Sequence, residues 1–149
     1  MDIKELKPTS IWHYFDAITG VPRPSKKEER IREFLLNFAK EQNLEVKVDK
    51  TGNVVITKEA TPGCEGAPTV ILQAHMDMVC EKNGDVKHDF ERDPIETYID
   101  GEWVKARGTT LGADNGIGMA AAMAVLADEE LKHGRIQALF TVDEETGLT

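Results

Sequence analysis

The sequence predicts an α/β fold in which a mixed, largely parallel sheet is flanked by helices. Two early segments have helical periodicity, two later segments are apolar runs of strand length, and an alanine-rich segment of helical length separates those runs. Strands and helices in this order form a sheet with helical cover. Because no repeat or low-complexity linker interrupts the 149 residues, we expect them to contain no internal domain boundary.

Two amphipathic helices are expected first. Residues 9–20 carry apolar residues near one face, and the prolines that follow end this helix. In residues 25–43, apolar residues recur at i, i+3, i+4 and i+7 from Ile31. Ser25 and Glu28 have the spacing of a capping box, which predicts that the second helix begins at this serine.

Two hairpins are expected. Residues 44–49 and 53–58 alternate or run apolar and are separated by Lys-Thr-Gly, which favours a pair of antiparallel strands. Residues 97–106 contain Asp-Gly between two short apolar stretches, which is typical of a tight hairpin turn.

Two strands and a helix follow the pattern of a covered sheet. Residues 69–77, "TVILQAHMD", are apolar without alternation, which is typical of a strand covered on both faces. Residues 113–131 are rich in alanine and long enough for about four helical turns. Residues 135–142 form a second apolar strand, which ends in acidic residues.

Composition and charge restrict the class of protein. The net charge of −9 argues against nucleic acid or an anionic membrane as a partner. No stretch approaches the ~18 apolar residues of a membrane span, and the N-terminus lacks the pattern of a signal peptide. The two cysteines, Cys64 and Cys80, form neither a CxxC pair nor a disulfide framework. We therefore expect a cytoplasmic protein.

Polar side chains stand where the predicted elements end. His75 and Asp77 close the first apolar strand, Glu144 and Glu145 follow the second, and Asp114 enters the alanine-rich helix. Ligands in open α/β sheets bind beyond the carboxyl ends of the strands, so we expect these side chains to converge. Crowded carboxylates repel unless a cation or proton intervenes. An imidazole with carboxylates and no thiolate suits Zn²⁺, Mn²⁺ or Co²⁺.

Roles for these residues follow from their positions. In an extended strand Asp77 faces the same side as His75, where it can accept the second ring N–H and fix the tautomer that binds metal. One of the two glutamates could bind metal while the other activates water. Each residue alone has a plainer interpretation: a structural histidine, a turn aspartate, a helix N-cap at Asp114, or a solvated strand end. The occurrence of three such clusters at successive element ends favours a site.

The three clusters also carry a resemblance. "HMDMV" (75–79), "GADNG" (112–116) and "DEETG" (143–147) resemble the ordered motifs of the M20 family of co-catalytic metallopeptidases. Longer strings, among them "LQAHMDMVCEKN" and "TTLGADNGIGMAAAMA", are similar to the aminoacyl-histidine dipeptidase (Xaa-His dipeptidase, peptidase D) branch of that family. The likeness covers essentially the whole chain.

The resemblance implies a role for each residue. His75 and Glu145 match terminal metal ligands, Asp114 a carboxylate that bridges two metals, Asp77 the residue that orients the histidine, and Glu144 the general base. It also implies two Zn²⁺ ions, with Co²⁺ or Mn²⁺ as alternatives, and hydrolysis of dipeptides, preferentially Xaa-His, by a metal-activated water. The full-length enzyme is expected to be a homodimer.

The family pattern extends past this sequence. It requires a further Asp and a further His as ligands, and a lid and dimerisation domain, all beyond Thr149. Residues 1–149 are therefore expected to be an incomplete, N-terminal part of the catalytic domain of a zinc-dependent exopeptidase. We expect this fragment to be inactive by itself. We also expect strand 135–142 to expose apolar surface, because any neighbours that come later in the family pattern would be missing beside it.

Other functions remain open at this point. Another activity of the family, such as a deacylase, aminotripeptidase or carboxypeptidase, would use the same motifs. A binding module could keep the fold without the chemistry. A nucleotide site at "LGADNGIG" is the weakest alternative, because the GxGxxG order and the Lys-Ser/Thr of a P-loop are missing.

Overall fold

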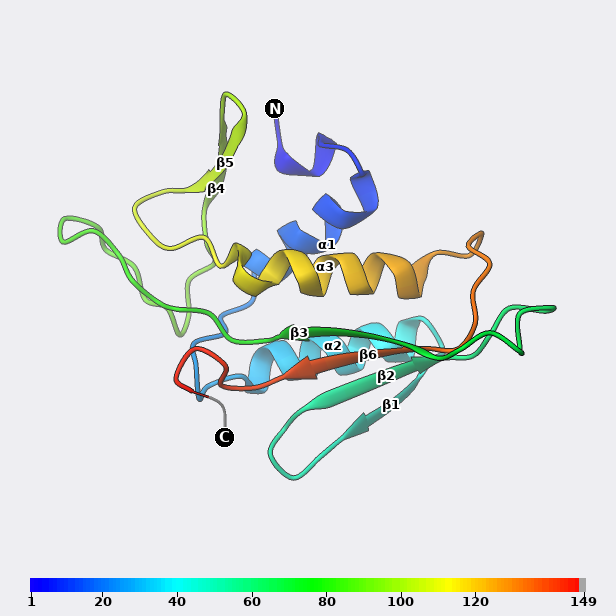
Figure 1. The fold of residues 1–149 in the computed structure, drawn as a ribbon. Helices are drawn as coiled ribbons and strands as arrows, with labels where there is room; N and C mark the ends of the chain where they lie inside the picture. The colour runs from blue at the N-terminus through cyan, green and yellow to red at the C-terminus, as the bar shows by residue number, and fades with distance from the viewer. Residues whose placement is uncertain (148–149) are drawn as a thin grey trace.

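The computed structural model describes residues 1–147, which form three helices, a four-stranded sheet and a separate two-stranded hairpin. Figure 1 shows α3 lying along β3 and β6, while the β4–β5 hairpin stands away from the main sheet. After a 3₁₀ turn at Ile3–Glu5, the elements are α1 (Thr9–Thr19), α2 (Glu29–Glu41), β1 (Glu45–Val48), β2 (Val54–Lys58), β3 (Val70–His75), β4 (Thr97–Asp100), β5 (Trp103–Ala106), α3 (Ala113–Ala127) and β6 (Ile136–Thr141).

The main sheet has the strand order β1-β2-β6-β3. The β1–β2 and β2–β6 pairs are antiparallel, and β3 pairs with β6 in parallel. The predicted α/β class with a mixed sheet is confirmed. Within residues 1–147 one of the three strand pairs of this sheet is parallel, so the parallel pairing here is limited to β3 and β6.

One continuous core lies between the sheet and the helices. On β6 alternate residues are buried, and Ile56 of β2 with Ala138 and Phe140 of β6 are fully buried. They belong to the same cluster as Phe15 of α1 and Leu35 of α2. The residues between them on β6 are only half-buried. The helices therefore pack against the face of the sheet that carries the fully buried side chains.

Strand β3 forms one edge of the sheet within residues 1–147. Val70 and Ile71, at its start, are 53% and 61% exposed, whereas His75 at its end is buried. The prediction of a strand covered on both faces is therefore wrong for the first half of β3. The predicted exposure of the 135–142 strand is also wrong, because β6 lies between β2 and β3.

Both predicted hairpins are present. The loop between β1 and β2 is held by Asp49, whose side chain accepts hydrogen bonds from the backbone N–H groups of Thr51, Gly52 and Asn53. The side-chain oxygen of Asn53 in turn accepts a hydrogen bond from the N–H of Val142, 3.0 Å away, at the end of β6. The first hairpin thus fastens the segment that leads into the two glutamates. Within residues 1–147 no helix is long and apolar enough to cross a bilayer.

Candidate metal centre

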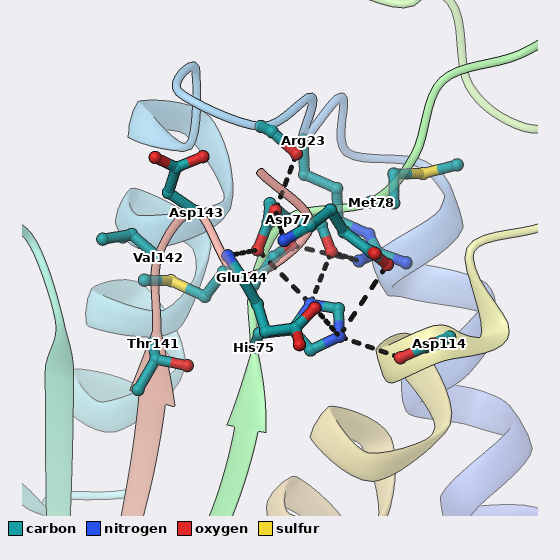
Figure 2. A network of polar contacts seen from close by, with 12 residues as sticks. Arg23, His75, Asp77, Met78, Asp114, Thr141, Val142, Asp143 and Glu144 are labelled. Carbon is teal, nitrogen blue, oxygen red and sulfur yellow. Dashed lines mark hydrogen bonds and ion pairs between the residues drawn. The ribbon is translucent and has the colours of Figure 1, made fainter. Parts of the chain in front are cut away.

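The predicted site residues lie at one edge of the sheet. Strands β3 and β6 are parallel and in register, with His75 opposite Thr141, so both chains leave the sheet at the same edge. The start of α3, which carries Asp114, lies beside the end of β3, on the side away from β6 (Figure 2). Topology alone therefore brings together three segments that are far apart in the sequence.

Three of the predicted ligands come within reach of a single ion. The Nε2 atom of His75 lies 2.8 Å from Oδ1 of Asp114 and 4.0 Å from Oε1 of Glu145. One ligand atom from each of the three residues lies within 4.8 Å of the others. Oε2 of Glu144 lies 3.7 Å from the same histidine nitrogen. The arrangement gives one imidazole and three carboxylates around a common point.

Asp77 holds the segments that carry the predicted ligands. Its side chain is completely buried and accepts hydrogen bonds from the hydroxyl of Ser25 and from the N–H groups of Glu144 and Glu145, at 2.7, 3.0 and 3.1 Å. Burial by itself raises the pKa of this carboxyl group, but the hydrogen bonds outweigh that effect and the pKa is lowered. A charged Asp77 therefore holds the turn that carries both glutamates.

The contact between His75 and Asp77 differs in detail from the expected one. The Nδ1 atom of His75 lies 2.9 Å from the main-chain oxygen of Asp77 and 3.3 Å from its carboxylate Oδ1. The hydrogen bond is therefore made with the backbone carbonyl, and the carboxylate adds an electrostatic contact. Either acceptor keeps the proton on Nδ1 and leaves Nε2 facing Asp114 and the glutamates.

Asp114 does not cap the helix, contrary to its plainer interpretation. The helix begins after Gly112, which has a φ of 77°, and Asp114 has non-helical backbone angles. Asn115 caps the regular part of α3 instead, since its side-chain oxygen accepts a hydrogen bond from the N–H of Gly118 at 3.0 Å. The side chain of Asp114 is 82% exposed apart from its contact with His75. Its carboxylate thus remains available to a ligand.

The glycines of this segment have a packing explanation. A Cβ atom on Gly116 would lie 2.8 Å from the guanidinium of Arg23, and one on Gly118 would collide with the side chain of Asn115. Close packing therefore accounts for the glycines that a nucleotide site would otherwise explain.

The crowding of charge shifts the pKa values of two groups of the site. Burial lowers the pKa of His75, but its hydrogen bonds with Asp114 and Asp77 outweigh that effect and raise the pKa. The pKa of Glu145 is raised by burial and by the neighbouring carboxylate of Asp114. Carboxylates this close favour a proton or a cation between them. A donor set of one imidazole and carboxylate oxygens fits Zn²⁺, Co²⁺ or Mn²⁺.

Two residues that contact the site were not assigned to it from the sequence alone. Ser25 does not form the predicted capping box: α2 begins at Glu29, the preceding residue Glu28 makes no side-chain cap, and the serine hydroxyl binds Asp77 instead. Arg23, from the same loop, is 1% exposed and its guanidinium binds backbone oxygens of the site. The one available signal for Arg23 is a charged residue set between two prolines in an otherwise apolar turn.

The fold and the clustered residues place the chain among α/β proteins whose ligand site lies beyond the carboxyl ends of the strands. Residues 71–148 match the model of peptidase family M20/M25/M40. The chain belongs to this family.

Individual relatives agree with the family. The chain is 53% identical, over 147 residues, to the cytosol non-specific dipeptidase of Escherichia coli (strain K12). The matched region covers 99% of this chain and 30% of that protein. The crystal structure of aminoacylhistidine dipeptidase from Vibrio alginolyticus superimposes with a TM-score of 0.98 at 56% identity, over 100% of this chain and 30% of the other. Aminopeptidase PepT from Bacillus cereus gives a TM-score of 0.73 at 27% identity, over 93% of this chain and 37% of the other. The chain thus spans 30% of the length of the two most similar of these three relatives.

Proposed function

We propose that this chain supplies part of the active site of a metal-dependent dipeptidase. The observation that carries the proposal is the group of His75, Asp114 and Glu145, whose ligand atoms lie within 4.8 Å of one another. These three residues would hold Zn²⁺, with Co²⁺ or Mn²⁺ as alternatives. When bound, the metal would lower the pKa of water and polarise the substrate carbonyl.

Glu144 is the general base in this proposal. Its backbone N–H is fixed by Asp77, while its side chain is 44% exposed and its Oε2 lies 3.7 Å from His75 Nε2. The carboxylate can therefore reach a water molecule beside the ligands. It would take the proton as the water oxygen bonds to the peptide carbon, and would give that proton to the amine when the C–N bond breaks.

A pocket beside the cluster offers room for a small substrate. Its volume is ≈ 370 Å³, and it is lined by Val79, Leu111, Ala113, Asp114 and Glu145, among others. An apolar wall facing two carboxylates suits a dipeptide, which has a cationic amino end and an uncharged peptide unit.

The finer points of the proposal rest on the relatives. The Vibrio relative is called an aminoacylhistidine dipeptidase and the Escherichia coli relative a non-specific dipeptidase, so we propose dipeptides as the substrate class with histidine preferred at the second position. The name of the second relative also supports a cytoplasmic location. Because the chain spans 30% of these proteins, the complete set of metal ligands is proposed to include residues outside it.

The test is turnover by the protein expressed from the complete reading frame. A panel of β-Ala-His, Gly-His, Gly-Leu, a tripeptide and an N-acetylated amino acid is assayed with EDTA and with restored Zn²⁺. We expect chelator-sensitive cleavage that is fastest for Xaa-His, and a loss of about 10²- to 10⁴-fold in Glu144→Gln. Glu129→Gln, at an exposed position, serves as the matched control. Preference for the tripeptide or the acetylated substrate would replace the dipeptidase proposal with another activity of the family, and absence of all turnover would leave a binding module.

A further inference from the structure

The loop between α1 and α2 places the buried, positively charged side chain of Arg23 beside the candidate metal centre. Arg23 is 1% exposed. Its Nη1 donates to the main-chain oxygens of Met76 and Asp77, 3.1 and 3.3 Å away, and its Nη2 donates to the main-chain oxygen of Gly112, 2.6 Å away. Burial lowers the pKa of this arginine to about 10, and the carboxylate of Asp77 is the strongest opposing influence, so the guanidinium stays charged at neutral pH.

The acceptors of Arg23 belong to the two segments that carry the predicted ligands. The carbonyl of Asp77 also lies 2.9 Å from Nδ1 of His75, so the same oxygen is bound by the arginine and the histidine. Gly112 lies two residues before Asp114. One rigid guanidinium therefore connects the end of β3 to the start of α3. These two segments carry His75 and Asp114, whose contact is drawn in Figure 2.

The sequence leaves space for this guanidinium. A Cβ atom on Gly112 would lie 2.6 Å from Nη2 of Arg23, and one on Gly116 would lie 2.8 Å from the same atom. Both glycines of "GADNG" therefore stand where a side chain would displace the arginine. The close fit indicates that the position of the guanidinium is fixed on the side of α3 as well as on the side of β3.

A second residue of the loop acts on the side chain of Asp77. The hydroxyl of Ser25 donates to Oδ2 of Asp77 at 2.7 Å. The loop itself lies along the strand extension, because the N–H of Met78 donates to the oxygen of Arg23 at 3.0 Å and Pro24 bridges to Met78 in parallel. Arg23 thus holds the backbone of Asp77 while Ser25 holds its carboxylate.

We infer that Arg23 and Ser25 are positioning residues of the metal centre. They fix the orientation of His75 and its separation from Asp114 and the glutamates, and neither residue contacts the ion or the substrate. The inference rests on the proposed function, since it assigns these residues to the metal site named there. Contacts of this kind, one step removed from the ligands, affect metal affinity by about 10- to 100-fold.

The test measures Co²⁺ affinity by visible absorption titration, using the protein from the complete reading frame stripped of metal. The variants are Ser25→Ala, Arg23→Lys and Arg23→Met, with Ser10→Ala and Arg107→Met as matched controls outside the site. All titrations are run well below the unfolding temperature of each variant, so that a purely structural role would leave the affinity of the folded molecules unchanged. We expect about 10-fold weaker binding for Ser25→Ala, a loss nearer 100-fold for Arg23→Met, and partial rescue by Arg23→Lys, because an ammonium group can bind one of the two segments.

The outcomes separate this inference from the proposed function. If the parent binds Co²⁺, His75→Ala abolishes that binding, and Ser25→Ala and Arg23→Lys bind as tightly as the parent, the metal centre stands and the positioning role is refuted. If His75→Ala binds Co²⁺ as the parent does, the proposed centre itself is refuted. Should Arg23→Met fail to fold, Ser25→Ala and Arg23→Lys still decide the question.

Discussion

Replacing Asp77 with asparagine is expected to lower the free energy of unfolding by about 2 kcal/mol at pH 7. The two oxygens of Asp77 accept three hydrogen bonds, from the hydroxyl of Ser25 and the N–H groups of Glu144 and Glu145. An asparagine offers one oxygen, and in either orientation its NH₂ group faces one of the two backbone N–H donors. A buried donor left without an acceptor costs about 1–3 kcal/mol, and the loss of the charge weakens the remaining bonds.

The pH dependence of this difference has a definite sign. Because the pKa of Asp77 in the folded protein is lowered from its ordinary value of 3.8, its carboxylate stabilises the fold at pH values above 3.8. That contribution is lost as the pH falls through the lowered folded-state pKa. The difference between the parent and Asp77→Asn should therefore be full between pH 5 and 7 and should shrink toward zero in more acidic solution.

The assay is urea unfolding followed by tryptophan fluorescence, with EDTA present so that no bound metal contributes. Asp85→Asn, which replaces an exposed carboxylate with the same change of charge, is the control and should lie within about 0.5 kcal/mol of the parent. If Asp77→Asn were as stable as Asp85→Asn at pH 7, Asp77 could not be the group that holds the turn of the two glutamates.

Three further outcomes are expected. Leu35→Ala, which empties a fully buried position, should cost about 3 kcal/mol in urea unfolding, whereas Leu131→Ala at a position 43% exposed should cost under about 1 kcal/mol. Gly118→Ala should destabilise the protein by about 1 kcal/mol, because its methyl group would displace the capping side chain of Asn115; a stabilised variant, as helix propensity alone predicts, would contradict the cap. Free Co²⁺ at about 100 times its dissociation constant should raise the free energy of unfolding by about 2.7 kcal/mol in the parent and have no effect in His75→Ala; an equal rise in both would place the ion elsewhere.

The helices, hairpins and gathering of the site were predictable because each depends on a short-range pattern or a general rule of topology. Apolar spacing indicated α2, and the Asp-Gly pair indicated the β4–β5 turn, where Asp100 pairs with Trp103. The meeting of His75, Asp114 and Glu145 followed from two strands that end at the same edge beside a helix N-terminus. Patterns of this kind are contained in the sequence itself.

What failed depends on contacts between distant residues. Ser25 has the local spacing of a helix cap, but its hydroxyl binds Asp77, which is 52 residues away. No pattern in the residues around Ser25 indicates that its hydroxyl binds this distant carboxylate and does not cap the helix. The sequence around Arg23 is that of an exposed turn. Its burial depends on the main-chain oxygens of Met76 and Gly112, which are distant in the sequence and accept its hydrogen bonds. The partial exposure of β3 depends on which strand lies at the edge of the sheet, and that order is a property of the whole fold.

The register of β3 against β6 has a consequence for folding. It places Ala74 opposite Phe140 in the core and His75 opposite Thr141 at the edge. Because side chains alternate along a strand, a slip of one residue would send the imidazole to the wrong face and a small apolar side chain toward Asp114. Slipped chains would then lack the nitrogen donor of the proposed centre, so a divalent ion that binds this centre during refolding would enrich the native pairing. Ion binding would thus select the correct register of β3 against β6 during folding, before the site takes part in any reaction.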